Sequence, residues 1–177
     1  MQIRNRVTWK GYLVLLASGV ACAATVSNVK NVNNVDKQFM VTAARTDMTL
    51  AHEGQMAEAQ AARADIKDFG KTLVQDHSMA YWQLSELAAK TGVTIPKGIN
   101  IGHDRAVEQL VHLKGASFDR QFTNDEISAD RQLLTAFRRE AKDGRDADVK
   151  AFANKMIPVL QKHLQLAEQF AKPVGRS

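Results

Sequence analysis

The sequence is poor in cysteine, proline and aromatic residues. Among 177 residues there are one cysteine, Cys22, and three prolines, and aromatic residues make up 6% of the chain. A single cysteine cannot form a disulfide within the chain, and removal of the first 23 residues would also exclude thiolate catalysis and Cys-ligated metals. The chain also lacks a Gly-rich phosphate loop, a nucleophile elbow and a Ser/His/Asp order, so the common nucleotide-binding and hydrolase classes have no support.

Long apolar runs and strand-like alternation are missing too. A helix that crosses a bilayer needs roughly 20 consecutive apolar residues, and the most apolar stretch, residues 11–20, is too short for that. From residue 35 onward apolar residues recur with the spacing of amphipathic helices, and alternating β-branched runs are few. We therefore expect one all-α domain over residues 35–172, long enough to bury a sizeable core, and a short tail at 173–177.

The first 23 residues have the order of a bacterial export signal. Basic residues come first, at Arg4, Arg6 and Lys10. The apolar run at 11–20 follows, and then the small residues Ala21-Cys22-Ala23 precede a cleavage position before Ala24. This order predicts a signal peptide at residues 1–23. Lipidation of Cys22 is the alternative, although Gly19 occupies a position where lipoprotein signals carry a large aliphatic residue.

Removal of this leader changes the charge balance and the expected location. Three of the 24 basic residues lie in the leader, which leaves 21 against 19 acidic residues and a net charge of +2. No basic cluster with interleaved aromatics remains, so nucleic acid is not an expected partner. Residues 24–34 are polar and aperiodic and are interpreted as a flexible tether. We expect a periplasmic or outer-membrane-associated protein with no transmembrane span in the mature chain.

Two sequence cassettes recur at an offset of 83 positions. Phe69 in Asp65-Ile66-Lys67-Asp68-Phe69 corresponds to Phe152 in Asp148-Val149-Lys150-Ala151-Phe152. The same offset, without a gap, places Phe39 on Phe122 and Asp47 on Asp130. Agreement of two separate cassettes indicates a duplicated helical hairpin.

The apolar stripes and the residues that can cap them predict four long helices. We expect them to run from Asp36, from just after Asp65 to Gly92, from Asp119 to Asp143, and from Asp148 to Lys172. Asp at a helix start can accept the free amides of the first turn, and Gly at its end can adopt the left-handed conformation. Pro158 should kink the last helix. With a short helix at residues 104–113 in the connection, the fold class is an all-α four-helix up-down bundle of two duplicated hairpins with one crossover.

Four motifs carry a resemblance to a known family. They are Asp36-x-x-Phe39, Asp76-His77, Gly115-x-x-Phe118-Asp119-Arg120, and Pro158-Val159-Leu160-x-x-His163-Leu164. In this order they resemble the exported bacterial family called domain of unknown function 4142, over about residues 35–171. The resemblance implies a ferritin-like bundle outside the cytoplasm, often labelled an outer membrane protein, with no established reaction. Family members commonly carry a second Asp-His pair where this chain has Ala129-Asp130.

Ionisable side chains near the predicted core are the candidates for a metal site. The candidate ligands are Glu53, Asp76, His77, Asp130 and His163, with Glu126 as an alternative to Asp130. Such oxygen and nitrogen donors suit iron, manganese or zinc. However, the Glu-x-x-His motif of di-iron bundles is missing, and the ligand set does not follow the 83-residue repeat. These features favour structural hydrogen-bonding roles and no cofactor, with the metal site as the alternative.

Two functions are therefore compatible with the sequence. The favoured one is a non-enzymatic envelope protein, a binding or stress-related bundle with a possible peripheral envelope or protein partner. The alternative is a divergent ferritin-like metalloprotein that binds iron, manganese or zinc in the bundle core. The sequence indicates neither a catalytic residue nor an oligomeric state.

Export makes the first testable prediction. Signal peptidase should cleave after the small residues at 21–23, so the mature chain in a periplasmic fraction should begin near Ala24. Intact-mass measurement of that fraction checks this. A mass that retains Met1, or one that includes a diacylglycerol group on Cys22, would contradict the predicted cleavage.

Overall fold

A computed structural model describes residues 32–99 and 105–172, and every regular element in these ranges is a helix. The helices are α1 (Asn34–Gln60), α2 (Ala64–Thr91), α3 (Arg105–Val111), α4 (Gly115–Asp143) and α5 (Ala147–Phe170). The prediction of an all-helical chain is confirmed. The predicted leader, most of the tether, residues 100–104 and the tail at 173–177 lie outside the described residues.

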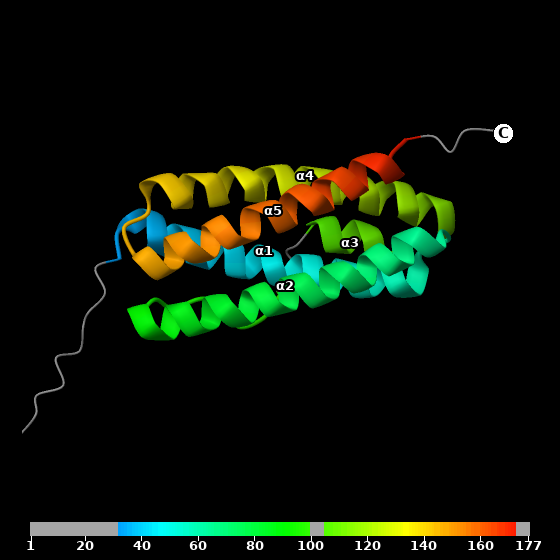
Figure 1. The fold of residues 1–177 in the computed structure, drawn as a ribbon. Coiled ribbons are helices and arrows are strands. Elements are labelled where there is room, and N and C mark those ends of the chain that lie inside the picture. The colour runs from blue at the N-terminus through cyan, green and yellow to red at the C-terminus, as the bar shows by residue number, and fades with distance from the viewer. Residues whose placement is uncertain (1–31, 100–104, 173–177) are drawn as a thin grey trace, which may run out of the picture.

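The four long helices lie side by side, and the short α3 lies against them (Figure 1). Residues 61–63 connect α1 to α2, and residues 144–146 connect α4 to α5. Each of these two pairs packs along its length. The contact of α1 with α4 joins the pairs, and α2 and α5 contact each other less extensively. The short helix α3 contacts α1 and α4.

All four long helices begin before their predicted starts, α2 at Ala64 and α4 at Gly115. α1 begins earlier than expected because Asn33 is its N-cap and forms a capping box with Asp36, with bonds of 2.9 and 2.6 Å. α5 begins at Ala147, after the N-cap Asp146 and one residue before the predicted start at Asp148. α2 ends as predicted at Gly92, whose φ of 71° is left-handed. Pro158 lies inside α5 and does not end it.

The two aspartates that were expected to cap helices each bind the backbone of a distant turn, and Asp36 does so in addition to its capping box. Asp36 Oδ1 accepts hydrogen bonds from the amides of residues 145–146, at 2.8 and 3.2 Å. Asp119, which lies within α4, accepts from the amides of residues 62–63, at 2.9 and 3.2 Å. Both the acceptors and the donor pairs are 83 positions apart. Each carboxylate therefore satisfies amides in the turn between two other helices, which holds the pairs together.

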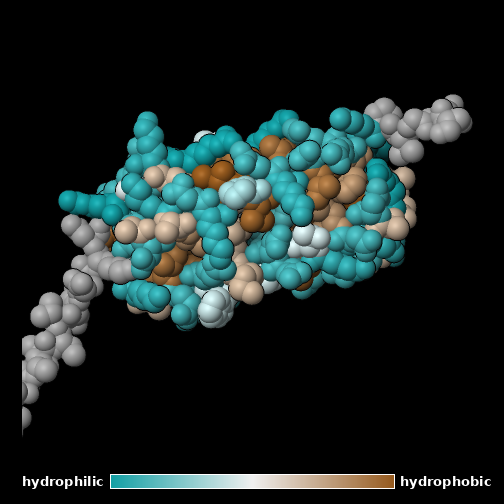
Figure 2. Space-filling model, in the orientation of Figure 1, coloured by the Kyte–Doolittle hydropathy of each residue, from teal (hydrophilic) through white to brown (hydrophobic). Residues whose placement is uncertain are grey.

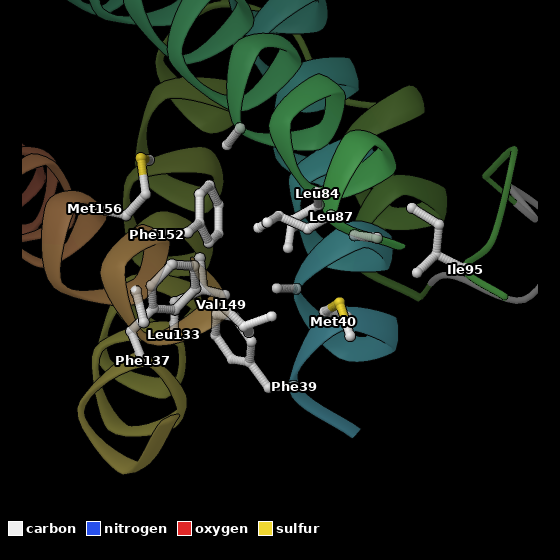
Figure 3. Packing of buried hydrophobic residues seen from close by; sticks show 14 of the residues in the cluster. Phe39, Met40, Leu84, Leu87, Ile95, Leu133, Phe137, Val149, Phe152 and Met156 are labelled. Atoms are coloured by element: carbon white, nitrogen blue, oxygen red, sulfur yellow. The ribbon is translucent and has the colours of Figure 1, made fainter. Parts of the chain in front are cut away.

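The core is divided into two apolar clusters. One contains Phe39, Phe137 and Phe152, and its packing is shown in Figure 3. The other contains Phe69 and Phe122 near the opposite ends of the same helices. The ring centroids of Phe39 and Phe152 are 6.2 Å apart, and so are those of Phe69 and Phe122. Edge and tilted contacts of this kind are favourable geometries for aromatic pairs.

Glycine allows α1 and α2 to approach each other closely at one point. A Cβ on Gly54 would lie 2.6 Å from the carbonyl oxygen of Gly70, and a Cβ on Gly70 would lie 2.6 Å from that of Gly54. Real Cβ atoms do not approach a backbone oxygen this closely. The crossing of α1 and α2 therefore requires glycine at both positions.

The surface shows scattered apolar residues. On the face shown in Figure 2, apolar patches are separated by hydrophilic side chains and do not form one continuous band. In the described residues no helix is long and apolar enough to cross a membrane. Trp82 on α2 is 59% exposed.

The buried aromatic rings make the second prediction. Phe69 and Phe152 are 4% and 5% exposed, so truncation of either to alanine should leave a cavity and lower the free energy of unfolding. Each substitution should cost about 3–5 kcal/mol, measured by urea denaturation. Trp82→Ala is the control, since change at an exposed position should cost within about 0.5 kcal/mol. An unchanged denaturation midpoint for either phenylalanine variant would show that the ring does not stabilise the core.

Candidate functional site

A layer of ionisable side chains separates the two apolar clusters. Its members are at most 1% exposed, and all four long helices contribute: Asp47, Glu53, His77, Glu126, Asp130 and His163. We call these six residues the polar layer. On each helix, apolar residues of the two clusters flank it: Ala44 and Met56 on α1, Leu73 and Ala80 on α2, Phe122 and Leu133 on α4, and Leu160 and Ala167 on α5. Helical spacing puts them on the same face, so the layer lies at the centre of the bundle.

Each buried imidazole is oriented by one carboxylate. His77 Nδ1 lies 2.9 Å from Asp47 Oδ1, and His163 Nε2 lies 2.9 Å from Asp76 Oδ2. With the carboxylates as acceptors, the protons lie on His77 Nδ1 and His163 Nε2. The two ring centroids are 5.4 Å apart.

The adjacent residues Asp76 and His77 therefore do not pair with each other. Consecutive residues on a helix point about 100° apart, so Asp76 reaches α5 while His77 reaches α1. His163 on α5 binds Asp76 across the helix interface. The histidine–carboxylate pairs thus connect α1 to α2 and α2 to α5.

Several buried polar atoms of the layer have no hydrogen-bond partner. They are Asp47 Oδ2, His77 Nε2, His163 Nδ1 and both carboxyl oxygens of Glu126 and Asp130. Leaving one such atom unsatisfied costs about 1–3 kcal/mol, and buried polar groups normally have partners. The layer therefore contains an unusual number of buried nitrogen and oxygen atoms that make no hydrogen bond.

Burial shifts the carboxyl groups of α4 towards their protonated forms. The pKa of Glu126 is raised well above its ordinary value by burial and then by the negative charges of Asp130 and Glu53. Burial raises the pKa of Asp130 to about 7, although the charge of His77 opposes the shift. Burial therefore favours the protonated form of Glu126, and Asp130 titrates near neutral pH.

The same environment keeps His163 neutral. Burial, followed by the charge of His77, lowers the pKa of His163 to about 4, although the hydrogen bond to Asp76 opposes the shift. Burial also raises the pKa of Asp47, against the hydrogen bond from His77. Burial thus favours the uncharged forms of Glu126, Asp130 and His163, which limits the net charge inside the layer.

The structure brings four of the five sequence candidates into the layer. Glu53, His77, Asp130 and His163 are buried there, together with the alternative candidate Glu126. The side chain of Asp76 lies at the edge, 36% exposed, and reaches the layer through its hydrogen bond to His163. Sequence reasoning did not select Asp47, although the 83-residue offset aligned it with Asp130.

The nitrogen and oxygen atoms of the layer are of the types that ligate metals, but they are not arranged around a common point. Within residues 32–99 and 105–172, no three His, Cys, Asp or Glu side chains already converge as a metal-binding group. An ion would need Glu126 or Asp130 to turn towards the imidazoles. The imidazoles themselves fit, because a ligating histidine commonly donates its other N–H to a carboxylate, and each here has one nitrogen left over.

A second buried acid, Glu140, has a different explanation. Neither of its carboxyl oxygens has a hydrogen-bond donor from the rest of the described chain. Burial, and then its interaction with the Asp36 side chain, raises the pKa of Glu140 to about 8. Burial also acts against ionisation of Asp36, but hydrogen bonds from backbone amides and from Glu140 hold the pKa of Asp36 below its ordinary value. Burial and the neighbouring carboxylate therefore favour a proton on Glu140 and an ionised Asp36 at neutral pH.

The fold and the polar layer define an all-helical protein with a buried carboxylate–histidine centre. A model of the family described as Domain of unknown function (DUF4142) matches residues 21–170, so the chain belongs to that family. This confirms the family suggested by the sequence motifs. Among curated proteins, none matches the sequence.

A solved structure shows a similar fold. It is a crystal structure of a DUF305 fragment from Deinococcus radiodurans, with a TM-score of 0.69 and 11% sequence identity. The match covers 79% of this chain and 97% of the fragment. At this identity the similarity concerns the fold alone and assigns no ligand or reaction.

The third prediction concerns Glu140. Because the pKa of Glu140 is raised to about 8 in the folded state, the folded chain holds a proton that the unfolded chain releases above its ordinary pKa. Stability should therefore fall as pH rises from about 5 to about 8. Glu140→Gln keeps a donor for Asp36 and cannot ionise, so it should flatten this part of the curve.

Thermal denaturation at several pH values measures the effect as a difference between the variant and the wild type. The comparison removes the contribution of the polar layer, which both proteins share. Glu86→Gln, a change at an exposed glutamate, is the control and should leave the curve parallel to the wild type. A Glu140→Gln curve with the wild-type slope would contradict the raised pKa of Glu140.

Proposed function

We propose that this chain is an exported, non-enzymatic helical bundle that binds one divalent metal ion in its polar layer. The observation that carries the proposal is the set of unpartnered buried donors at one level of the bundle: His77 Nε2, His163 Nδ1 and the carboxyl oxygens of Glu126 and Asp130. Two nitrogen and two carboxylate ligands suit iron(II), manganese(II) or zinc.

Charge supports a cation as the missing partner. The layer contains four acidic and two imidazole side chains, and burial pushes its carboxyl groups to retain protons. A divalent cation would replace those protons and would use the oxygens that now have no donor. The apolar clusters on both sides enclose the ligand atoms within a packed core, which favours an ion over a bulky organic ligand.

Orientation of the imidazoles supports the same site. Asp47 and Asp76 hold the two rings by their other nitrogens, so that His77 Nε2 and His163 Nδ1 are the atoms left to ligate. This arrangement fixes the tautomer and increases the basicity of the ligating nitrogen. In this proposal Asp47 and Asp76 are positioning residues, Glu126 and Asp130 are ligands, and Glu53 contributes negative charge.

The proposal includes export from the cytoplasm and an origin by duplication of a helical hairpin. The leader-like order of residues 1–23 supports export to the periplasm or the outer membrane. The matched contacts of Asp36 and Asp119 support duplication of a helical hairpin, because both the acceptors and the amides they bind are separated by 83 positions. The packing of four long helices supports an up-down, ferritin-like bundle.

A structural layer without metal is the second candidate. The observation that favours it is that each imidazole already has one carboxylate partner, which satisfies half of its hydrogen-bonding capacity. Protons on Glu126 and Asp130 would then neutralise the remaining charge. In that case His77→Gln should cost only about 1 kcal/mol, the net value of one hydrogen bond.

Metal analysis provides the fourth prediction and separates the two candidates. Untagged protein purified from its native compartment should contain iron, manganese or zinc near one ion per chain, measured by elemental mass spectrometry. Glu126→Gln and Asp130→Asn should each lose most of the metal, because an amide is a far weaker ligand than a carboxylate. Both variants keep the volume of the original side chain, so the core should remain packed.

Glu140→Gln is the matched control. Glu140 is also a buried glutamate on α4 without a donor, but it lies at the end of the bundle, away from the layer. Its replacement should leave metal content unchanged. Background metal in the wild type, and no uptake when the metal-free protein is incubated with each ion in turn, would refute the metal site and leave the structural role.

A further inference from the structure

A recess between α1 and α2 reaches the polar layer from the surface. It has a volume of about 240 Å³, and Asp47 and His77, both fully buried, lie at its inner end. Exposed Gln55 and Ser78 belong to its outer part, on α1 and α2 respectively. The recess therefore runs from solvent-exposed residues to two residues of the layer.

The third wall of the recess comes from the connection after α2. Gly98 and Ile99 line it, and the preceding segment is held in place because Tyr81 Oη donates a hydrogen bond of 2.9 Å to the carbonyl of Pro96. Ile95 is 8% exposed and packs into the apolar cluster, which anchors the same segment. The packed residues 95–96 hold this wall next to α2.

The inner end of the recess carries an unused anionic ligand atom. Asp47 Oδ1 is bonded to His77, whereas Asp47 Oδ2 is buried and has no hydrogen-bond partner. A cation moving inward would meet Asp47 Oδ2 and then the imidazole of His77, whose Nε2 is also unpartnered. A carboxylate oxygen can replace part of the hydration shell that the ion loses on entering the core.

We infer that this recess is the route by which a divalent cation reaches the polar layer, and that Asp47 Oδ2 is the first buried ligand it contacts. The inference rests on the proposed metal site and adds the path and the transient ligand. It also gives Asp47 a second role besides orienting His77.

A recess on the opposite side of α1 provides the comparison. It lies between α1 and α4, has a volume of about 230 Å³, and is lined by residues that include Thr46, Ser128 and Gln132. No residue of the polar layer lines it. Bulk added there should leave the path of the ion open, which makes it a matched control for the first recess.

The experiment, our fifth prediction, measures the rate of metal uptake. Metal-free full-length mature protein is mixed with cobalt(II), whose visible absorption reports coordination by nitrogen and oxygen ligands, in a stopped-flow instrument. Ser78→Trp should slow uptake at least about tenfold because the indole fills the outer part of the recess. Ser128→Trp, the same change at an exposed serine of the opposite recess, should stay within about twofold of the wild type. The cobalt bound at equilibrium should be equal in all three proteins.

A second variant keeps the test informative if Ser78→Trp fails to fold. Gln55→Trp adds bulk from α1 to the same recess and should slow uptake like Ser78→Trp, and circular dichroism checks that both variants fold. If the wild type binds cobalt and neither recess variant slows its uptake, the route is wrong while the metal site stands. If Ser128→Trp slows uptake as much as Ser78→Trp, the route is also wrong. If the wild type binds no cobalt, both the site and the route are overturned.

Discussion

The burial of six ionisable side chains at one level of the bundle constrains the rest of this structure. Removing charges from water costs several kcal/mol per group unless partners or protons compensate. Here two carboxylates orient the imidazoles, and burial raises the pKa values of Glu126 and Asp130, which favours their protonated forms. The apolar clusters on either side supply the stability that makes such a layer tolerable. Their division into two clusters is itself a result of the layer, since four helices place a polar residue at the same height.

The sequence predicts the elements of this fold better than the partners of its polar groups. Periodicity located the helices, and the glycine at position 92 marked the end of α2, because both signals are local along the chain. Aspartates at 36 and 119 read as caps, and their contacts with distant turns depend on tertiary packing that no local rule contains. For the same reason the neighbouring Asp76 and His77 suggested a pair, whereas each bonds to a residue on another helix. Asp47 was aligned with Asp130 by the offset, but its burial required the packed structure.

The polar layer breaks the regularity of the 83-residue repeat. Asp47 and Asp130 correspond to each other, and both are buried in the layer. By contrast, His77 corresponds to Leu160, His163 to Ala80 and Glu53 to Ala136. Under the proposed duplication, the two hairpins kept their phenylalanines and turn-binding aspartates while the centre diverged. Such divergence argues against two equivalent sites related by the repeat, and it is compatible both with a structural layer and with the single site proposed above.

The glycine contact between α1 and α2 has a mechanical consequence. At Gly54 and Gly70 the two backbones touch, so their separation cannot decrease there. Asp47 and His77 each lie seven residues from this contact, which is about 10 Å along either helix. A small change in the angle between the helices would hardly move the glycines, but it would change the distance between Asp47 and His77. A change of crossing angle that widened the recess at its inner end would have to lengthen or break the 2.9 Å hydrogen bond between these two residues.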